Sequence, residues 1–251
     1  MYRISVGALF KNESHSMKEW LEHYLYHGID HFYLINDAST DNFLEILQPY
    51  IDKGVVTLFN ANIGYYLGRQ RNMYNKFILP CIHETKWLLM MDLDEYVWSR
   101  ESIDINTIFK QLDDIGQIQI RENLFGSNGH TEQPSTIVNS FTKRKLMGKQ
   151  YDGPYKYAIN TSFKFTSLNV HHATFEDKQD ELNHFIILTN PHLMYNHYNC
   201  QSLQFWKEVK MTRGDSDNYR ERTVESFKEL DKNDVEDFEL LEQNKNITPF
   251  L

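Results

Sequence analysis

Short apolar runs alternate with amphipathic stretches through the first hundred residues. Four of the apolar runs have strand length and lie at 4–10, 31–35, 55–59 and 87–91. Apolar residues recur at helical spacing in the segments between them, at 16–27, 42–51 and 69–82. Strands separated by helices predict right-handed βαβ units. The pattern therefore indicates an α/β fold with a mainly parallel central sheet flanked by helices.

The periodic signal is weaker after residue 100. We expect a helix over 103–115, a strand over 116–120 and a glycine-rich loop over 125–130. Late strands are expected over 185–188 and 194–198, and a helical segment follows them. No repeat or linker interrupts the sequence, so we expect a single domain.

The stretch Trp87–Tyr96 reads Trp-Leu-Leu-Met-Met-Asp-Leu-Asp-Glu-Tyr. Its apolar residues suit a strand that is covered on both faces. Ligands bind beyond the carboxyl ends of strands in open α/β sheets, so Asp92, Asp94 and Glu95 should lie at the mouth of a crevice. Neighbouring carboxylates repel one another, and Mg²⁺ or Mn²⁺ would relieve this repulsion. The stretch predicts a metal–diphosphate site, with a solvated surface turn as the competing interpretation.

Composition excludes several functional classes. The formal net charge of −9 argues against a nucleic-acid binder, since an acidic surface repels phosphates. Cys81 and Cys200 are the only cysteines, which predicts neither a disulfide framework nor a cysteine-based zinc site. No run of ~20 apolar residues predicts a transmembrane segment. We therefore expect a cytoplasmic protein of bacterial or viral origin, with peripheral membrane attachment left open.

Known nucleotide motifs are absent from the sequence. There is no Gly-x-x-x-x-Gly-Lys-Ser/Thr loop, and no Gly-x-Gly-x-x-Gly follows the first apolar run. Their absence argues against ATPases and dehydrogenases. Polar residues after the predicted strands can still line a nucleotide pocket, and the candidates are Lys11, Asn12, Glu13, Asp37, Gly64, Arg69 and Gln70. Arg69 could equally be a surface helix residue.

The later half supplies a candidate metal ligand and a basic pair. His197, in Tyr195-Asn196-His197-Tyr198, comes at the end of a predicted strand. An imidazole there could complete a carboxylate site while leaving positions for phosphate oxygens. Lys210 and Arg213 follow, and they could neutralise a leaving diphosphate.

Taken in order, these pieces resemble a GT-A type glycosyltransferase, near the family 2-like and family 92 (DUF23-like) enzymes. The matching pieces are Lys11-Asn12-Glu13, Glu19-Trp20-Leu21-Glu22-His23-Tyr24, Gly28-Ile29-Asp30-His31, Asp37 with Ser39-Thr40-Asp41-Asn42, Met91-Asp92-Leu93-Asp94-Glu95-Tyr96, Phe125-Gly126-Ser127-Asn128-Gly129-His130, Asn196-His197-Tyr198 and Arg213-Gly214. Animal-type family 92 proteins usually carry an N-terminal membrane anchor, which this sequence does not show. Their Lys-Ser after His-Tyr is replaced by Cys200-Gln201-Ser202.

The resemblance implies a Rossmann-like GT-A fold and a nucleotide-sugar donor. It implies that Mn²⁺ or Mg²⁺ is held by Asp92, Asp94 and His197, and that Asp37 contacts the nucleoside. We expect one domain over 1–251, with a nucleotide-binding half at 1–100, an acceptor and metal half at 101–200 and a helical segment at 201–251. Asp92 is also expected to contact the donor.

We therefore predict transfer of a sugar from a uridine-based donor to a hydroxyl of a glycan or glycoconjugate. The candidates for the base that takes the acceptor proton are Glu122, Asp152 and His171. The candidates for acceptor contact are Phe125, Gly126 and His130. A sugar-phosphate nucleotidyltransferase and a non-catalytic nucleotide-sugar-binding module are the alternatives.

Overall fold

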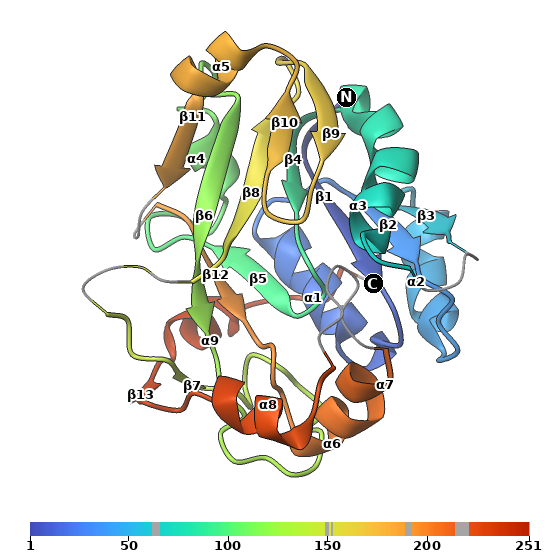
Figure 1. Ribbon diagram of the computed structural model, residues 1–251, viewed down its shortest axis with the longest axis vertical. Coiled ribbons are helices and arrows are strands. Elements are labelled where there is room, and N and C mark those ends of the chain that lie inside the picture. The colour runs from blue at the N-terminus through green and yellow to red at the C-terminus, as the bar shows by residue number, and fades with distance from the viewer. Residues whose placement is uncertain (62–65, 149–150, 152, 189–191, 214–220, 251) are drawn as a thin grey trace.

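The computed structural model describes residues 1–61, 66–148, 151, 153–188, 192–213 and 221–250, and these residues form a nine-stranded sheet flanked by helices (Figure 1). The strands of this sheet are β1 (Tyr2–Phe10), β2 (His31–Asn36), β3 (Val56–Asn60), β4 (Thr85–Met90), β5 (Glu95–Trp98), β6 (Gln117–Leu124), β8 (Tyr155–Asn160), β11 (Phe185–Leu188) and β12 (Met194–His197). Two short pairs lie apart from it, β9 (Phe165–Leu168) with β10 (Ala173–Phe175) and β7 (Lys143–Arg144) with β13 (Val235–Glu236).

The strand order is β3-β2-β1-β4-β8-β6-β12-β5, and β11 pairs with β6. The first four strands are parallel to one another. β8 is antiparallel to both β4 and β6, whereas β11 and β12 are parallel to β6 and β5 is antiparallel to β12. Of the strands described in this sheet, only β8 and β5 run against the rest. The predicted mainly parallel α/β sheet is confirmed.

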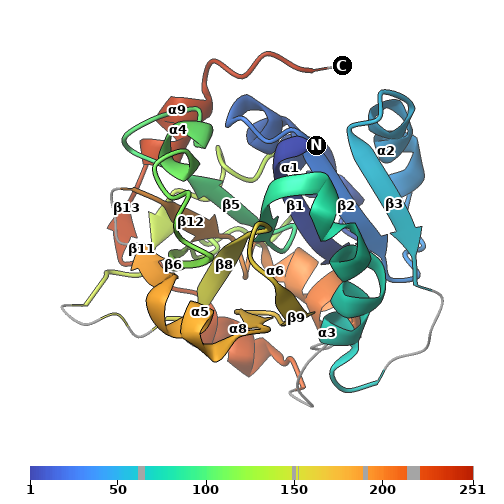
Figure 2. The same ribbon diagram turned by 90° about the horizontal axis from the view of Figure 1, so that it is seen from above.

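Helices cover both faces of the sheet. The α-helices are α1 (Ser14–Tyr26), α2 (Phe43–Asp52), α3 (Arg69–Met73), α4 (Asn106–Phe109), α5 (Lys178–Asn183), α6 (Leu203–Phe205), α7 (Met211–Arg213), α8 (Val224–Leu230) and α9 (Glu239–Asn244). The π-helix η1 (Tyr74–Ile78) and the 3₁₀-helix η2 (Leu79–Glu84) continue α3, and the π-helix η3 (Trp206–Lys210) continues α6. Figure 2 shows α1 and α2 on one face and α3 on the opposite face. None of the described helices has both the length and the apolar character needed to cross a membrane.

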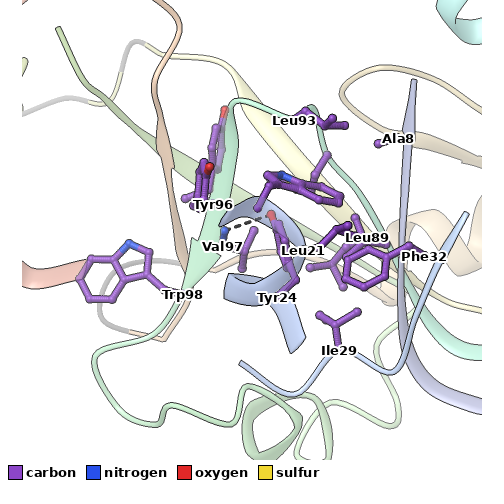
Figure 3. Packing of buried hydrophobic residues seen from close by; sticks show 14 of the residues in the cluster. Ala8, Leu21, Tyr24, Ile29, Phe32, Leu89, Leu93, Tyr96, Val97 and Trp98 are labelled. Carbon is purple, nitrogen blue, oxygen red and sulfur yellow. Dashed lines mark hydrogen bonds between the residues drawn. The ribbon is translucent and has the colours of Figure 1, made fainter. Parts of the chain in front are cut away.

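The second half of β4 is buried on both faces, as the apolar run from Trp87 predicts. Trp87 and Leu89 pack in the cluster that contains the apolar stripe of α1. Leu88 and Met90 pack in the cluster on the α3 side. In Figure 3, Leu89 lies beside α1, whose Tyr24 hydroxyl accepts a hydrogen bond from the backbone of β5. The core therefore fixes the end of β4 from two sides.

The helix α9 docks onto α1 through a partly buried polar contact. The Asn244 side chain donates to His23 Nδ1 at 3.1 Å. His23 Nε2 lies 2.9 Å from the backbone oxygen of Val97, to which it can donate. Both nitrogens of a neutral His23 are therefore satisfied. Burial lowers the pKa of His23 well below its ordinary value.

Two sequence expectations need correction. The helix expected over 103–115 is only α4, because the chain turns after Phe109 and the amides of residues 116 and 117 bond to the His184 carbonyl instead. The central strand β8 was not expected. Its residues alternate between the two core clusters, with Tyr157 in one and Ala158 in the other. The division of the chain into a single domain with two halves stays a prediction.

Candidate active site

The turn that carries the carboxylates is held in place by α1. It joins β4 directly to β5, and the Glu95 amide donates to the Asp92 carbonyl at 3.1 Å. Trp20 Nε1 donates to the carbonyl oxygens of Asp92 and Glu95 at 3.1 and 3.0 Å. The Tyr24 hydroxyl donates to the Glu95 carbonyl at 2.9 Å. Because Trp20 and Tyr24 are fully buried, the turn is rigidly connected to the core.

A buried lysine lies between two of these carboxylates. Lys156 Nζ is 2.7 Å from Asp92 Oδ2 and 3.1 Å from Glu95 Oε2, and its side chain is 2% exposed. Gln70 donates to Asp92 Oδ1 at 2.9 Å. Burial lowers the pKa of Lys156, but the charges of Asp92 and Glu95 raise it well above its ordinary value. Burial raises the pKa of Glu95 to about 7 although Lys156 acts in the opposite direction.

Asp94 forms a second charged group with His197 and Lys210. Lys210 Nζ donates to Asp94 Oδ2, and Asp94 Oδ1 lies 3.6 Å from His197 Nε2. The other ring nitrogen, Nδ1, contacts Glu122 Oε1 at 2.5 Å. Burial raises the pKa of Asp94, but Lys210 and His197 hold it well below its usual range. Burial lowers the pKa of His197, but Asp94 and Glu122 raise it to about 10.

Three side chains present ligand atoms to a common point. One carboxylate oxygen each of Asp94 and Glu95 and a nitrogen of His197 lie within 4.8 Å of one another. The two carboxylate oxygens suit Mn²⁺ or Mg²⁺, and the imidazole adds a nitrogen ligand of the kind that first-row transition metals bind. The contact of Nδ1 with Glu122 directs Nε2 toward this point, as second-shell carboxylates do at metal sites. The residues therefore fit such a cation. The cluster contains Glu95, whereas the predicted third ligand was Asp92.

The predicted nucleotide side is formed by loops after β1 and β2. Asn12 Oδ1 accepts from the Thr40 amide at 2.8 Å, and the Asn12 amide donates to Ser39 Oγ at 3.1 Å. Lys11 and Glu13 flank Asn12, and Glu13 is buried at the start of α1. These contacts connect the two loops at the edge of the sheet where parallel strands end.

Asp37 and Arg69 form an ion pair between the end of β2 and the start of α3. Arg69 is 2% exposed, and it also donates to the Ala61 carbonyl at 3.2 Å. Arg69 is thus a buried residue and not a surface helix residue. Gly64 lies outside the described residues, as does the side chain of Arg213.

The predicted acceptor residues have structural partners. Phe125 is buried, and the centroid of its ring lies 4.8 Å from the centroid of the Tyr198 ring. The Gly126 amide donates to the Lys143 carbonyl, and His130 Nε2 lies 3.1 Å from the Ser140 carbonyl. Whether these residues contact an acceptor stays a prediction.

Of the three predicted bases, Glu122 is in contact with His197, and Asp152 lies outside the described residues. His171 is partly exposed in the turn between β9 and β10. Its Nδ1 lies 2.7 Å from the Tyr155 carbonyl. Partial burial and the charge of Lys156 lower the pKa of His171.

The sequence matches a known family over most of its length. The family model of Glycosyltransferase family 92 covers residues 2–240. The chain belongs to glycosyltransferase family 92. Membership confirms the predicted class of enzyme, a glycosyltransferase.

Two curated relatives come from Arabidopsis thaliana. Galactan beta-1,4-galactosyltransferase GALS2 is 24% identical over 131 residues, which are 46% of this chain and 24% of that protein. Galactan beta-1,4-galactosyltransferase GALS3 is 25% identical over 131 residues, covering 46% of this chain and 25% of that protein. The family 92 chain thus spans about a quarter of the length of each relative.

A solved structure shares the fold. The crystal structure of S. aureus TarS 1-349 in complex with UDP-GlcNAc aligns with a TM-score of 0.50 and 15% sequence identity, over 91% of this chain and 64% of that chain. This likeness confirms the predicted GT-A fold.

Sequence reasoning missed Lys156 altogether, and it placed Glu95 at the crevice without naming it as a metal ligand. β8 runs against its neighbours, so its first residues lie at the edge where β4 and β6 end. Lys156 lies between Tyr155 and Tyr157, and this alternation of aromatic and polar residues was the available signal for a strand. In the family 92 chain, the lysine comes from a central strand that the pattern did not reveal.

Proposed function

We propose that the chain catalyses metal-dependent transfer of a sugar from a uridine diphosphate donor to a hydroxyl of a glycan or glycoconjugate. The observation that carries this proposal is the convergence of Asp94, Glu95 and His197 at the end of β4 in a GT-A fold. The two relatives are named as galactosyltransferases that act on galactan, and the TarS structure contains UDP-GlcNAc. These names support the donor and acceptor classes.

Each charged residue has a distinct part in this proposal. Asp94, Glu95 and His197 would hold Mn²⁺ or Mg²⁺, which supplies Lewis-acid stabilisation of the leaving diphosphate when bound. Lys210, which contacts Asp94, would add a donor to the diphosphate oxygens. Asp92, with 31% of its side chain exposed, remains accessible to the donor. Asp37, Arg69 and the loop of Lys11, Asn12 and Glu13 would line the nucleoside side.

We assign the acceptor base to His171, for direct displacement by the acceptor hydroxyl. The Nδ1 contact with Tyr155 favours the tautomer whose Nε2 can accept a proton. The lowered pKa of His171 favours the neutral imidazole, which a base requires. Glu122 fits this role less well because His197 occupies its carboxylate.

Hydrolysis of nucleotide sugars tests the proposal. The chain is incubated with a panel of nucleotide sugars, with Mn²⁺ or with chelator, and release of the nucleoside diphosphate is measured. We expect slow metal-dependent hydrolysis of a UDP-sugar that is lost in Asp94→Asn. Asp113→Asn is the matched control, because this carboxylate is exposed and contacts only Lys86 among the ion pairs of the described residues.

Other outcomes would contradict the proposal. Release of pyrophosphate from a nucleoside triphosphate and a sugar phosphate would indicate a nucleotidyltransferase. Binding of nucleotide sugars without turnover, with or without acceptors, would indicate a binding module.

A further inference from the structure

Lys156 occupies a position that has the surroundings of a cation site. Its ammonium contacts Asp92 Oδ2 and Glu95 Oε2 at 2.7 and 3.1 Å. The other oxygen of Glu95, Oε1, lies 4.0 Å from His197 Nε2, within the ligand cluster described above. Glu95 therefore bridges two positions, one at the proposed metal and one at the lysine.

Carboxylates that bridge two cations are the pattern of two-metal sites, where the ions lie ≈ 3.5–4 Å apart. We propose that the Lys156 ammonium takes the place of a second divalent cation and so restricts this site to one metal ion. Lys156 is then a positioning residue, because it fixes Asp92 and Glu95 without contacting the reacting atoms. This inference rests on the proposed function, since it takes the cluster of Asp94, Glu95 and His197 as the first metal site.

Charge balance supports this role. The side chains of Lys156 and Glu95 are each 2% exposed, so water does little to screen the charge of Glu95, whereas the Asp92 side chain is 31% exposed. Removing the ammonium leaves the buried Glu95 carboxylate beside that of Asp92 without their shared cation, and a like charge next to a buried carboxylate is unfavourable. The Asp92 amide and the Gln70 side chain still donate to these carboxylates, at 2.8 and 2.9 Å, but neither carries a charge. A second divalent ion with water ligands would restore the balance.

The test counts ions bound to the full chain without donor. Metal-free wild type and Lys156→Ala are titrated with Mn²⁺ alone, and electron paramagnetic resonance measures free Mn²⁺ and coupling between bound ions. We expect one Mn²⁺ per wild-type chain and two per Lys156→Ala chain, with a spin-coupled signal only in the variant. The matched control combines Lys156→Ala with Asp92→Asn, so that one negative charge is removed together with the positive one. This double variant should again bind one Mn²⁺ per chain.

The possible failures are distinguishable. Wild type that binds one ion, together with a Lys156→Ala variant that also binds one, overturns this inference and leaves the proposed function intact. Wild type that binds no Mn²⁺ overturns the metal-dependent function itself. Wild type that binds two ions overturns the inference even if Lys156→Ala does not fold. Lys156→Gln is the second variant, because its amide oxygen can serve as a ligand, and it should also take up two ions.

Discussion

Replacement of Glu122 by glutamine separates two roles that this residue could have. Glu122 Oε1 contacts His197 Nδ1 at 2.5 Å, and its side chain is 8% exposed. Glutamine keeps an acceptor for Nδ1 but removes the negative charge that makes the imidazole a stronger ligand. We therefore expect weaker metal binding in the variant, even before any donor is added.

The size of the effect follows from this geometry. Loss of an outer-shell partner of a metal-bound histidine typically costs 10–100-fold in metal affinity. Because Glu122→Gln keeps the hydrogen bond, we expect about a tenfold rise in the Mn²⁺ Kd, or about 1.4 kcal/mol. Glu122→Ala removes the contact as well, and about a hundredfold rise is expected.

Calorimetric titration of metal-free protein with Mn²⁺ measures this Kd directly. Glu101→Gln is the matched control, because Glu101 contacts His192 at 2.9 Å on the exposed surface. Its Mn²⁺ affinity should equal that of the wild type. If Glu122 were the acceptor base, Glu122→Gln would lose roughly 10²–10⁴-fold in kcat with an unchanged Mn²⁺ Kd. That result would refute our account of Glu122.

Three further predictions concern stability. The pKa of His23 is lower in the folded chain than in the unfolded one, so the stability that neutral His23 contributes is present above pH ~6.5 and is lost as the pH falls. In urea unfolding, the difference in free energy of unfolding between wild type and His23→Gln should therefore shrink by about 1.4 kcal/mol per pH unit below that value. A difference that does not change with pH would contradict this prediction. Gly28→Ala should lower the thermal midpoint, because φ is +91° and a Cβ would lie 2.2 Å from Asp104 Oδ1; an unchanged midpoint would show that the backbone relaxes. Arg69→Met should lower the free energy of unfolding in urea by roughly 3–5 kcal/mol, because it leaves the Asp37 carboxylate without its buried partner. The double variant Arg69→Met with Asp37→Asn should lose less stability, and an equal loss in both variants would argue against that cause.

The fold from β1 to β4 could be predicted because local pattern and tertiary environment agree there, whereas β5 was not expected. β4 is apolar from Trp87 to Met90 and is buried there on both faces, and the flanking helices pack apolar residues against it. β8 differs because its environment comes from strands distant in sequence, β4 and β6. Lys156 interrupts its apolar run, and only the neighbouring carboxylates make a lysine acceptable inside the sheet. These carboxylates lie far from Lys156 in the sequence, so no local pattern conveys that compensation.

The candidate metal site shows where reasoning from strand geometry reaches its limit. In an extended chain, Asp92 and Asp94 would point to the same side because side chains alternate. The strand ends at Met90, however, and the hydrogen bond from the Glu95 amide to the Asp92 carbonyl closes a turn. Asp92 consequently faces Lys156, while Glu95 joins Asp94 beside the late histidine. The Asp-Leu-Asp motif located the site, but the turn determines which carboxylates face the same point. The alternation of side chains along an extended strand does not predict such a turn.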